Sequence, residues 1–376
     1  MYKDLSSNNT SKDPAKIIRC KRCVMDTTDP DIIFDENGIC NHCKEAEKQL
    51  NNVLRKKEDF NVAEFVSKMK KNGRDKEYDC IVGLSGGVDS CYVIHLMKTM
   101  DVRPLAVHID NGWNTELAVQ NIKNLLERLD VDLYTYVLNW EEFRDLQLAF
   151  LKASTPDSEI PTDHMIRPIL SMVADYYRVK YVIFGINSAT ESILPKSWSY
   201  GHNDWKYIKG IHDRFGTVPL KTFVYHTRMM SYFFREKQKW FYLLDYIDYS
   251  KDEAKKLLME KYAWRDYGGK HYESFYTRFY QSYILPTKFG FDKRKMHLSN
   301  LIVSGQMSRA EAIQILNEPL YDDEQIKRDI EYFCEKMDIQ KGEFQRIMAL
   351  PIKTFNDYPS YENDIFGWLK RRMYTD

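Results

Sequence analysis

The sequence predicts an α/β fold in which helices cover both faces of a doubly wound parallel sheet. Between residues 79 and 184, short apolar segments of strand length alternate with longer segments of helix length. The first apolar segment also runs directly into a turn that contains two glycines and opens a helix. Because parallel strands need long crossover connections, this alternation indicates a sheet covered on both faces.

The expected elements follow one another regularly along this part of the chain. Strands are expected at residues 79–84, 104–109, 133–138 and 180–184. Helices are expected at about residues 88–99, 115–129, 141–151 and 165–177. Open sheets of this kind bind their ligands beyond the carboxyl ends of the strands, so the segments that follow the strands are the first place to search for a site.

The chain of 376 residues is expected to consist of five segments. They are a disordered polar tail (1–16), a cysteine ribbon (17–46), a helical connector (47–76), the α/β domain (77–230) and a largely helical C-terminal region (231–376).

Composition argues against several classes of protein. Lys plus Arg equals Asp plus Glu at 55 each, so nucleic acid is not expected as the main partner. No apolar run approaches the roughly 20 residues of a membrane helix, and the polar N-terminus does not resemble a signal peptide. We therefore expect a cytoplasmic protein without membrane contact.

The turn after the first strand has the chemistry of a phosphate cradle. Its residues are Ser85, Gly86, Gly87, Val88, Asp89 and Ser90. The glycines allow close backbone approach, the helix start presents N–H groups to an anion, and the serines add hydroxyl donors. Asp89 would repel phosphate without a metal, so it is a candidate Mg²⁺ ligand. The alternative is a glycine turn that only caps a helix.

This turn resembles the PP-loop of enzymes that split ATP between the α- and β-phosphates, and the Walker A pattern is absent. Two further segments occur where such enzymes bind the nucleotide. In residues 106–112, His108 and Asp110 are candidates for holding adenine and ribose. In residues 185–191, Gly185 and Glu191 resemble a segment whose glutamate helps to bind Mg²⁺. Ile186 replaces the usual threonine there, and Glu191 could instead be an ordinary surface glutamate.

Four cysteines form two pairs with the spacing of a zinc ribbon. Cys20 and Cys23 are separated from Cys40 and Cys43 by 16 residues, which is typical of a closed structural Zn²⁺ site. Two disulfides or an iron–sulfur cluster are the alternatives. His42 is a further possible ligand, and the other three cysteines are expected to be inert.

Several motifs together resemble the N-acetyl sugar amidotransferase family, over most of the chain from about residue 18. They are RCKRCVMDTTDP (19–30), GICNHC (38–43), the PP-loop, PTDH (161–164) and KFGFD (288–292). The resemblance implies conversion of a sugar acetamido group to an acetamidino group in bacterial surface-polysaccharide, lipopolysaccharide O-antigen or nonulosonic-acid synthesis. It implies ATP, Mg²⁺ and Zn²⁺ as cofactors and a nucleotide-linked or free N-acetylated sugar as substrate.

Such a reaction would activate the amide oxygen as an adenylate and then let ammonia displace AMP. Besides Asp89, the candidates for catalysis are Asp163, His164 and Arg167, and each of these is about as consistent with a solvated surface position. Further candidate phosphate clamps are Lys196, Lys206, Lys209 and Arg228.

No glutaminase signature occurs, since residue 2 is tyrosine and a Gly-x-Cys-x-Gly turn is absent. The resemblance therefore implies a separate glutaminase and a cyclase-like subunit that channels ammonia. The first alternative function is that of a tRNA-thiolating PP-loop enzyme with a zinc ribbon, which would require reactive cysteines and a basic face. The second is a regulatory nucleotide-binding protein without turnover.

Overall fold

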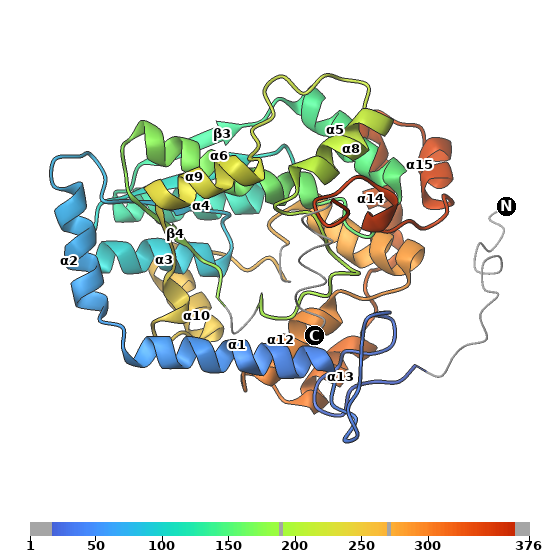
Figure 1. Cartoon of the computed structure of the whole chain (residues 1–376), viewed down its shortest axis with the longest axis horizontal. Helices are drawn as coiled ribbons and strands as arrows, with labels where there is room; N and C mark the ends of the chain where they lie inside the picture. The colour runs from blue at the N-terminus through green and yellow to red at the C-terminus, as the bar shows by residue number, and fades with distance from the viewer. Residues whose placement is uncertain (1–16, 188–190, 269–271, 365–376) are drawn as a thin grey trace.

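The computed structural model describes residues 17–187, 191–268 and 272–364, and it contains a five-stranded, fully parallel sheet with helices on both faces (Figure 1). The strands are β1 (Cys80–Gly83), β2 (Pro104–Asp110), β3 (Leu133–Val137), β4 (Tyr181–Phe184) and β5 (Lys239–Tyr242). The first four confirm the predicted strands and the predicted α/β fold. Strand β5 was not expected, because it lies in the region 231–376 that we expected to be helical.

The helices of the sheet and of the segment before it occupy most of the expected ranges. They are α1 (Asn41–Glu58), α2 (Val62–Gly73), α3 (Val88–Thr99), α4 (Glu116–Leu129), α5 (Trp140–Ala153), α6 (Ile160–Tyr176), α8 (Trp205–Phe215) and α9 (Arg228–Lys237). Helix α6 begins five residues earlier than expected, with Pro161 in its first turn, where a missing backbone N–H costs nothing.

The C-terminal region is helical, as predicted. It contains α10 (Lys251–Tyr262), α11 (Phe275–Phe279), a π-helical segment (Tyr280–Phe289), α12 (Arg294–Val303), α13 (Arg309–Asn317), α14 (Asp323–Met337) and α15 (Lys341–Met348).

Side chains of β1 alternate between two apolar layers, as the period of a strand requires. Val82 belongs to the core beneath α3 and α4, where Ile94 and Leu125 are buried. Ile81 belongs to the opposite core, where Ile169 of α6 is buried. Both faces of the central strand are therefore covered, which explains why β1 is almost continuously apolar.

The strand order β3-β2-β1-β4-β5 reverses direction beside β1. The chain moves outward through β2 and β3, and then returns to place β4 on the other side of β1. In open parallel sheets such a reversal leaves a crevice at the carboxyl ends of the two strands that flank it. The loop after β1 and the loop after β4 therefore border the same crevice.

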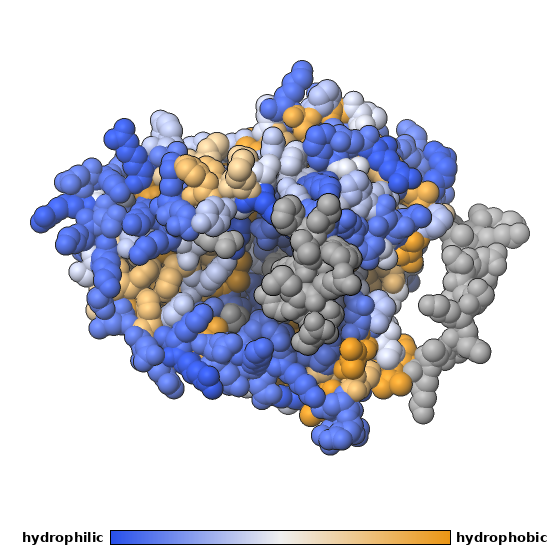
Figure 2. Space-filling view, in the orientation of Figure 1, coloured by the Kyte–Doolittle hydropathy of each residue, from blue (hydrophilic) through white to orange (hydrophobic). Residues whose placement is uncertain are grey.

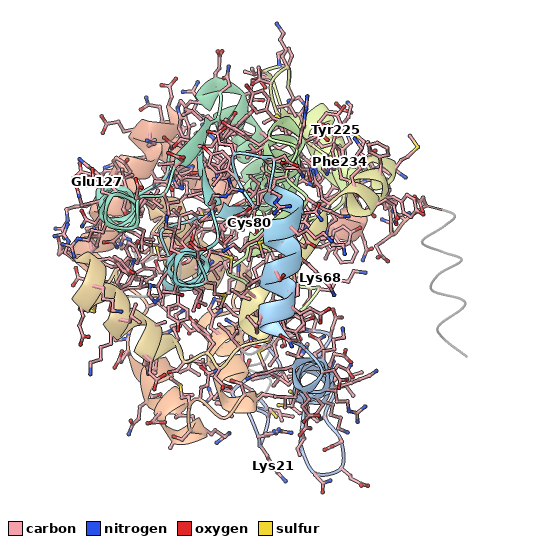
Figure 3. All side chains as sticks on the ribbon, turned by 90° about the vertical axis from the view of Figure 1, so that its left-hand side faces the viewer. Lys21, Lys68, Cys80, Glu127, Tyr225 and Phe234 are labelled. Carbon is pink, nitrogen blue, oxygen red and sulfur yellow. The ribbon has the colours of Figure 1, made fainter. Side chains whose placement is uncertain are left out.

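The surface in Figure 2 is mostly hydrophilic, with apolar side chains gathered over α9, where Met229 is 80% and Phe233 is 53% exposed. Among the described residues, no helix combines the length and the apolar character needed to cross a bilayer. Figure 3 shows Cys80 in the interior behind α2, whose Lys68 points outward.

The start of β1 is fixed by one buried carboxylate. Asp79 accepts hydrogen bonds from the backbone N–H of Arg103 at 2.9 Å and from its guanidinium at 2.7 Å. Arg103 also donates to the carbonyls of Gly73 and Lys76, so this pair joins α2, β1 and β2 at one corner of the sheet.

We predict that Asp79→Ala lowers the free energy of unfolding by about 2 kcal/mol, because it leaves several donors of Arg103 without their acceptor. Denaturant unfolding measures this change. The matched control is Glu64→Gln, which removes the exposed ion pair with Lys68 on α2 and should cost about 0.5 kcal/mol or less. Equal losses in the two variants would contradict the role assigned to Asp79.

Candidate functional site

The PP-loop connects β1 to α3 at the crevice and is held open by its own serines. The Ser85 N–H donates to Ser90 Oγ at 3.2 Å, and the Ser90 hydroxyl donates to the Gly87 carbonyl at 3.1 Å. Gly87 is the N-cap of α3, so the N–H groups of the first turn have no partner within the helix. The loop therefore presents backbone donors and a helix N-terminus to an anion, as the sequence predicted.

Glycine is required at Gly86 by backbone conformation and by space. Its φ of +90° lies in a region that other residues avoid, and an added Cβ would lie 3.2 Å from the Tyr267 hydroxyl oxygen and 3.3 Å from the Ala118 carbonyl oxygen. At Gly87 an added Cβ would approach Glu273 Oε1 to 3.4 Å. The two glycines thus form a shallow cradle whose walls come from distant segments.

Gly185, at the end of β4, lies directly against the start of α3. A Cβ at this position would be 2.7 Å from Ser90 N and 2.8 Å from Ser90 Cα, which is closer than real contacts allow. The three nearest atoms are all backbone atoms of Asp89 and Ser90, so only glycine lets the two loops of the crevice touch. The predicted role of Gly185 in the site is consistent with this position.

Asp89 is in the first turn of α3, and its carboxylate has two partners from one distant segment. The Tyr249 hydroxyl donates to Asp89 Oδ1, and Lys251 Nζ lies 3.7 Å from Asp89 Oδ2. Burial, followed by the charge of Asp89, raises the pKa of Tyr249, and Glu191 contributes to the same shift. Both carboxylates therefore act electrostatically on the same hydroxyl.

His108 and Asp110 lie at the carboxyl end of β2, beside the loop. His108 Nδ1 donates to the Leu84 carbonyl at 2.8 Å, and its Nε2 accepts from Asn114 at 3.1 Å. Burial lowers the pKa of His108, so the ring is neutral and braces the end of β1. Asp110 accepts from the Gly112 N–H at 2.9 Å, which turns the chain at the point where a ribose contact was predicted.

His164 is buried in α6 and both of its ring nitrogens are occupied by backbone. Nδ1 donates to the His202 carbonyl at 2.9 Å, and Nε2 accepts from the His226 N–H at 3.3 Å. In this arrangement His164 joins three segments and has no nitrogen left for a substrate proton, which differs from the proton-handling role we expected.

Asp163 and Arg167, from the same helix, face more open surroundings. Asp163 lies 3.3 Å from His202 Nε2. Arg167 is exposed; it donates at 2.5 Å to the hydroxyl of Tyr242, the last residue of β5, and its guanidinium lies over the Trp240 ring. Arg167 therefore reaches the carboxyl end of β5, and Asp163 contacts the segment before α8.

The further candidate clamps are dispersed. Lys209 pairs with Asp213 on the exposed side of α8, and Lys196 pairs with Glu362 at 3.2 Å. Arg228 lies over the Tyr361 ring. Each of these three cations contacts a partner that does not belong to the PP-loop, so the structure does not bring them to the loop.

Sequence reasoning missed the residues that contact the loop from the second half of the chain. They are Tyr249, Lys251, Trp264, Tyr267 and Glu273. The local signal was weak, because a tyrosine before Gly268 and Gly269 is an ordinary turn sequence.

The four ribbon cysteines converge at a second candidate site. Their Sγ atoms all lie within 4.8 Å of one another, with Cys20 to Cys43 at 3.9 Å and Cys23 to Cys40 at 3.7 Å. A regular tetrahedron with metal–sulfur bonds of about 2.3 Å has edges of about 3.8 Å. The donor set and its spacing therefore fit a single tetrahedral ion, and all four side chains are fully buried.

His42 is engaged elsewhere, since its Nε2 is 2.6 Å from Asp29 Oδ2. Cys40 caps α1 and Cys43 lies in its first turn, so the helix begins inside the ribbon and earlier than the connector we expected at 47.

The ribbon is anchored on the C-terminal helices. Arg309 donates to the carbonyls of Cys20 and Cys23 at 3.0 Å each, and Ser299 Oγ accepts from the Val24 N–H at 3.2 Å. The ribbon thus packs against α12 and α13, at the lower edge of Figure 1.

We predict that stability falls as the pH drops below about 6.5, because burial lowers the pKa of His164 to about 4. Between pH 6.5 and 4 the unfolded chain binds a proton at this residue and the folded chain does not. The stability that neutral His164 contributes is therefore fully present above pH 6.5 and is lost progressively as the pH falls to 4. The resulting loss in the free energy of unfolding should be roughly 1–2 kcal/mol at pH 5, relative to neutral pH. Thermal unfolding at pH 7, 6 and 5 measures the slope, which should be smaller in His164→Gln; an unchanged slope would refute this assignment.

Comparisons with known proteins give partial matches. The chain is 30% identical over 173 residues to the uncharacterized protein MJ1599 of Methanocaldococcus jannaschii, covering 45% of this chain and 58% of that protein. It is 37% identical over 70 residues to the tRNA(Ile)-lysidine synthase of Chlamydia pneumoniae, covering 18% of this chain and 22% of that enzyme. The chain thus spans less than two thirds of either relative.

Similar solved structures are distant. The NH3-dependent NAD synthetase of Campylobacter jejuni has a TM-score of 0.28 at 17% identity, covering 37% of this chain and 58% of its own. The tRNA thiolase NcsA of Methanococcus maripaludis, solved with its 4Fe–4S cluster, has a TM-score of 0.30 at 15% identity, covering 80% and 88%. Scores this low carry no functional information.

The family comparison is more specific. Residues 273–373 match the model of the C-terminal domain of WbpG-like LPS biosynthesis proteins. The matched range begins at Glu273 beside the PP-loop and includes the helices on which the ribbon is anchored. This match agrees with the family resemblance drawn from the sequence motifs, over the quarter of the chain that it covers: residues 273–373 are similar to the C-terminal domain of the WbpG-like LPS biosynthesis proteins.

Proposed function

We propose that this protein is an ATP-dependent amidotransferase that converts the acetamido group of an N-acetylated sugar to an acetamidino group in lipopolysaccharide synthesis. The observation that carries the proposal is the pairing of a phosphate cradle, Ser85 to Ser90 at the sheet crevice, with a C-terminal domain of the LPS biosynthesis type at its border. The cradle supports nucleotide use, and the domain supports the class of acceptor.

The chemistry explains the need for ATP. An acetamide carbon is a poor electrophile and its oxygen is a poor leaving group. Attack of the amide oxygen on the α-phosphorus breaks the bond to the β-phosphate and releases pyrophosphate, while the amide nitrogen loses its proton. Ammonia then adds to the activated carbon, and AMP departs with the original amide oxygen.

The residues at the crevice suit positioning and charge stabilisation more than covalent catalysis. The loop N–H groups and the start of α3 would bind the β- and γ-phosphates, and Asp89 with Glu191 would hold Mg²⁺, which neutralises the departing pyrophosphate. Asp110 would contact the ribose, and Asp163 and Arg167 would line the acceptor side.

The nitrogen source would be a separate glutaminase with an ammonia-channelling cyclase-like subunit. Support comes from the sequence, which has the ATP loop but no glutaminase signature. An adenylated imidate is prone to hydrolysis, so direct delivery of ammonia favours the productive reaction over attack by water.

Thiolation of tRNA is less well supported. That chemistry would use a reactive cysteine near the loop, and the nearest candidates, Cys80 and Cys91, are fully buried. Burial raises the pKa of both thiols, which keeps them protonated and poorly nucleophilic.

Zinc at the ribbon is the second part of the proposal. We predict one Zn²⁺ per chain, held by Cys20, Cys23, Cys40 and Cys43, in protein purified without added metal. Cys20→Ser should lower zinc content and thermal stability, because metal binding in such ribbons supplies folding free energy. Cys334→Ser, at a buried cysteine of α14, is the matched control and should retain the metal. Less than about half an equivalent of zinc, or an iron–sulfur absorption band, would overturn this assignment.

We predict that the purified chain, given MgATP, ammonium and a nucleotide-linked diacetamido sugar, releases AMP and pyrophosphate and forms an amidino sugar. Replacing oxygen by NH lowers the mass by about one unit and adds a group that stays cationic at neutral pH, as a guanidinium does. Mass spectrometry and electrophoretic mobility measure these two changes independently. Glutamine alone should not support the reaction.

The variant that tests the site is Asp89→Ala, which should reduce pyrophosphate release at least about a hundredfold because a metal clamp on the phosphates is lost. Its control is Asp323→Ala, which removes an acidic side chain from the first turn of α14 instead. Sulfur incorporation into tRNA would favour the thiolase, and nucleotide binding without turnover on any acceptor would favour a regulatory protein.

A further inference from the structure

The segment 249–267, which contains α10, contacts the PP-loop at two separate points. One end supplies Tyr249 and Lys251 to the Asp89 carboxylate. The other end supplies Trp264 and Tyr267 to the Gly86 carbonyl. Since each of these residues follows the loop residue that it contacts by 160 or more positions, only the tertiary fold brings them there.

The contact at Gly86 is a double hydrogen bond to one oxygen. Trp264 Nε1 donates to the Gly86 carbonyl at 3.0 Å, and the Tyr267 hydroxyl donates to the same oxygen at 2.6 Å. Trp264 is 1% exposed, and burial raises the pKa of Tyr267, so its hydroxyl keeps the proton that it donates. Two donors use both lone pairs of this carbonyl and fix its direction.

The direction of the Gly86 carbonyl fixes that of the Gly87 N–H. Both groups belong to one planar trans peptide, in which C=O and N–H point in opposite directions. Gly86 has a φ of +90° and no side chain, so without an external partner this peptide would be the most easily rotated part of the loop. Holding the carbonyl toward Trp264 and Tyr267 therefore directs the Gly87 N–H away from these two side chains, to the side where it donates to Ser85 Oγ.

The donors are themselves held by neighbouring elements. The side chain of Asn121 in α4 exchanges two hydrogen bonds with the backbone of Arg265, each of 2.8 Å. Leu258 of α10 is buried in the core that α10 shares with α3. The segment is thus attached to the two helices that flank the loop and can transmit their position to it.

We propose that Trp264 and Tyr267 are positioning residues for the phosphate loop, which hold the Gly86–Gly87 peptide in the orientation that donates the Gly87 N–H to the pyrophosphate portion of ATP. The proposal rests on the proposed binding of ATP at this loop. The Gly87 N–H at present donates to Ser85 Oγ at 3.2 Å, a long bond that a phosphate oxygen can replace.

The test compares Tyr267→Phe with Tyr262→Phe by calorimetric titration of the full chain with MgATP, inorganic pyrophosphate and AMP. Each variant removes one hydroxyl from the α10 segment, but Tyr262 bonds His95 and does not contact the loop. Tyr267→Phe should weaken binding of ATP and pyrophosphate about fivefold to tenfold, as expected for one lost hydrogen bond, and change AMP binding less than about twofold. Tyr262→Phe should leave all three affinities within about twofold of wild type.

Tyr267→Phe with wild-type affinity for ATP and pyrophosphate would overturn the proposal, and so would an equal loss for ATP, pyrophosphate and AMP, which would indicate a general structural defect. Trp264→Phe removes the other hydrogen bond to the same oxygen and should weaken the binding of ATP and pyrophosphate in the same way. Wild-type protein that binds neither ATP nor pyrophosphate would instead overturn the proposed function on which this inference rests.

Discussion

Two backbones touch where the strand order of the sheet reverses, and the geometry of the candidate site depends on this contact. The turn after β4 at Gly185 lies against the first turn of α3, with no room for a Cβ before Ser90 N is reached at 2.7 Å. Because β4 pairs directly with β1, the loop after each strand is forced into the same crevice. In a sheet of this topology an anion reaches the loop from the carboxyl side of the strands.

The N-terminal half of the fold supplies the loop, but the other half fixes its shape. The backbone N–H of Thr115 donates to the Glu273 carbonyl at 2.9 Å, so the segment that begins the C-terminal domain lies along the chain that leaves β2. From there the Glu273 side chain reaches the space above Gly87. A loop rich in glycine has high conformational freedom, and these contacts remove much of that freedom before any ligand binds.

Local patterns predicted what local physics determines. The four strands and the loop were found because buried parallel strands are continuously apolar and because a glycine turn before a helix has a recognisable sequence. The convergence of the four cysteines was predicted from their spacing alone.

Strand β5 was missed because Lys239–Tyr242 is a short edge segment with three aromatic residues, and its sequence pattern does not differ from that of the helical segments around it. Trp264 and Tyr267 were missed because no sequence pattern around them indicates a contact with Gly86. Only the packing of α10 on α3 brings their side chains to this residue. His164 was expected to move protons because histidine often does, but its burial between two backbone partners is a tertiary property.

Two buried lysines at the start of α12 explain how the ribbon, the α/β domain and the C-terminal domain keep one arrangement. Lys293 lies 3.5 Å from Glu159 at the start of α6, and Lys295 lies 2.6 Å from Asp26 in the ribbon. Asp26 is fully buried and both lysines are largely so. A buried charge without its partner raises the free energy of the folded state by several kcal/mol. A shift of the C-terminal domain relative to the ribbon or the α/β domain would separate these pairs and is therefore unfavourable. These pairs contribute less to the net stability than apolar packing of equal size would. They do, however, select one position of the C-terminal domain relative to the ribbon and the α/β domain, which is its register. Since the same domain carries Glu273 at the loop, the register that the lysines select is also the register that places Glu273 beside Gly87.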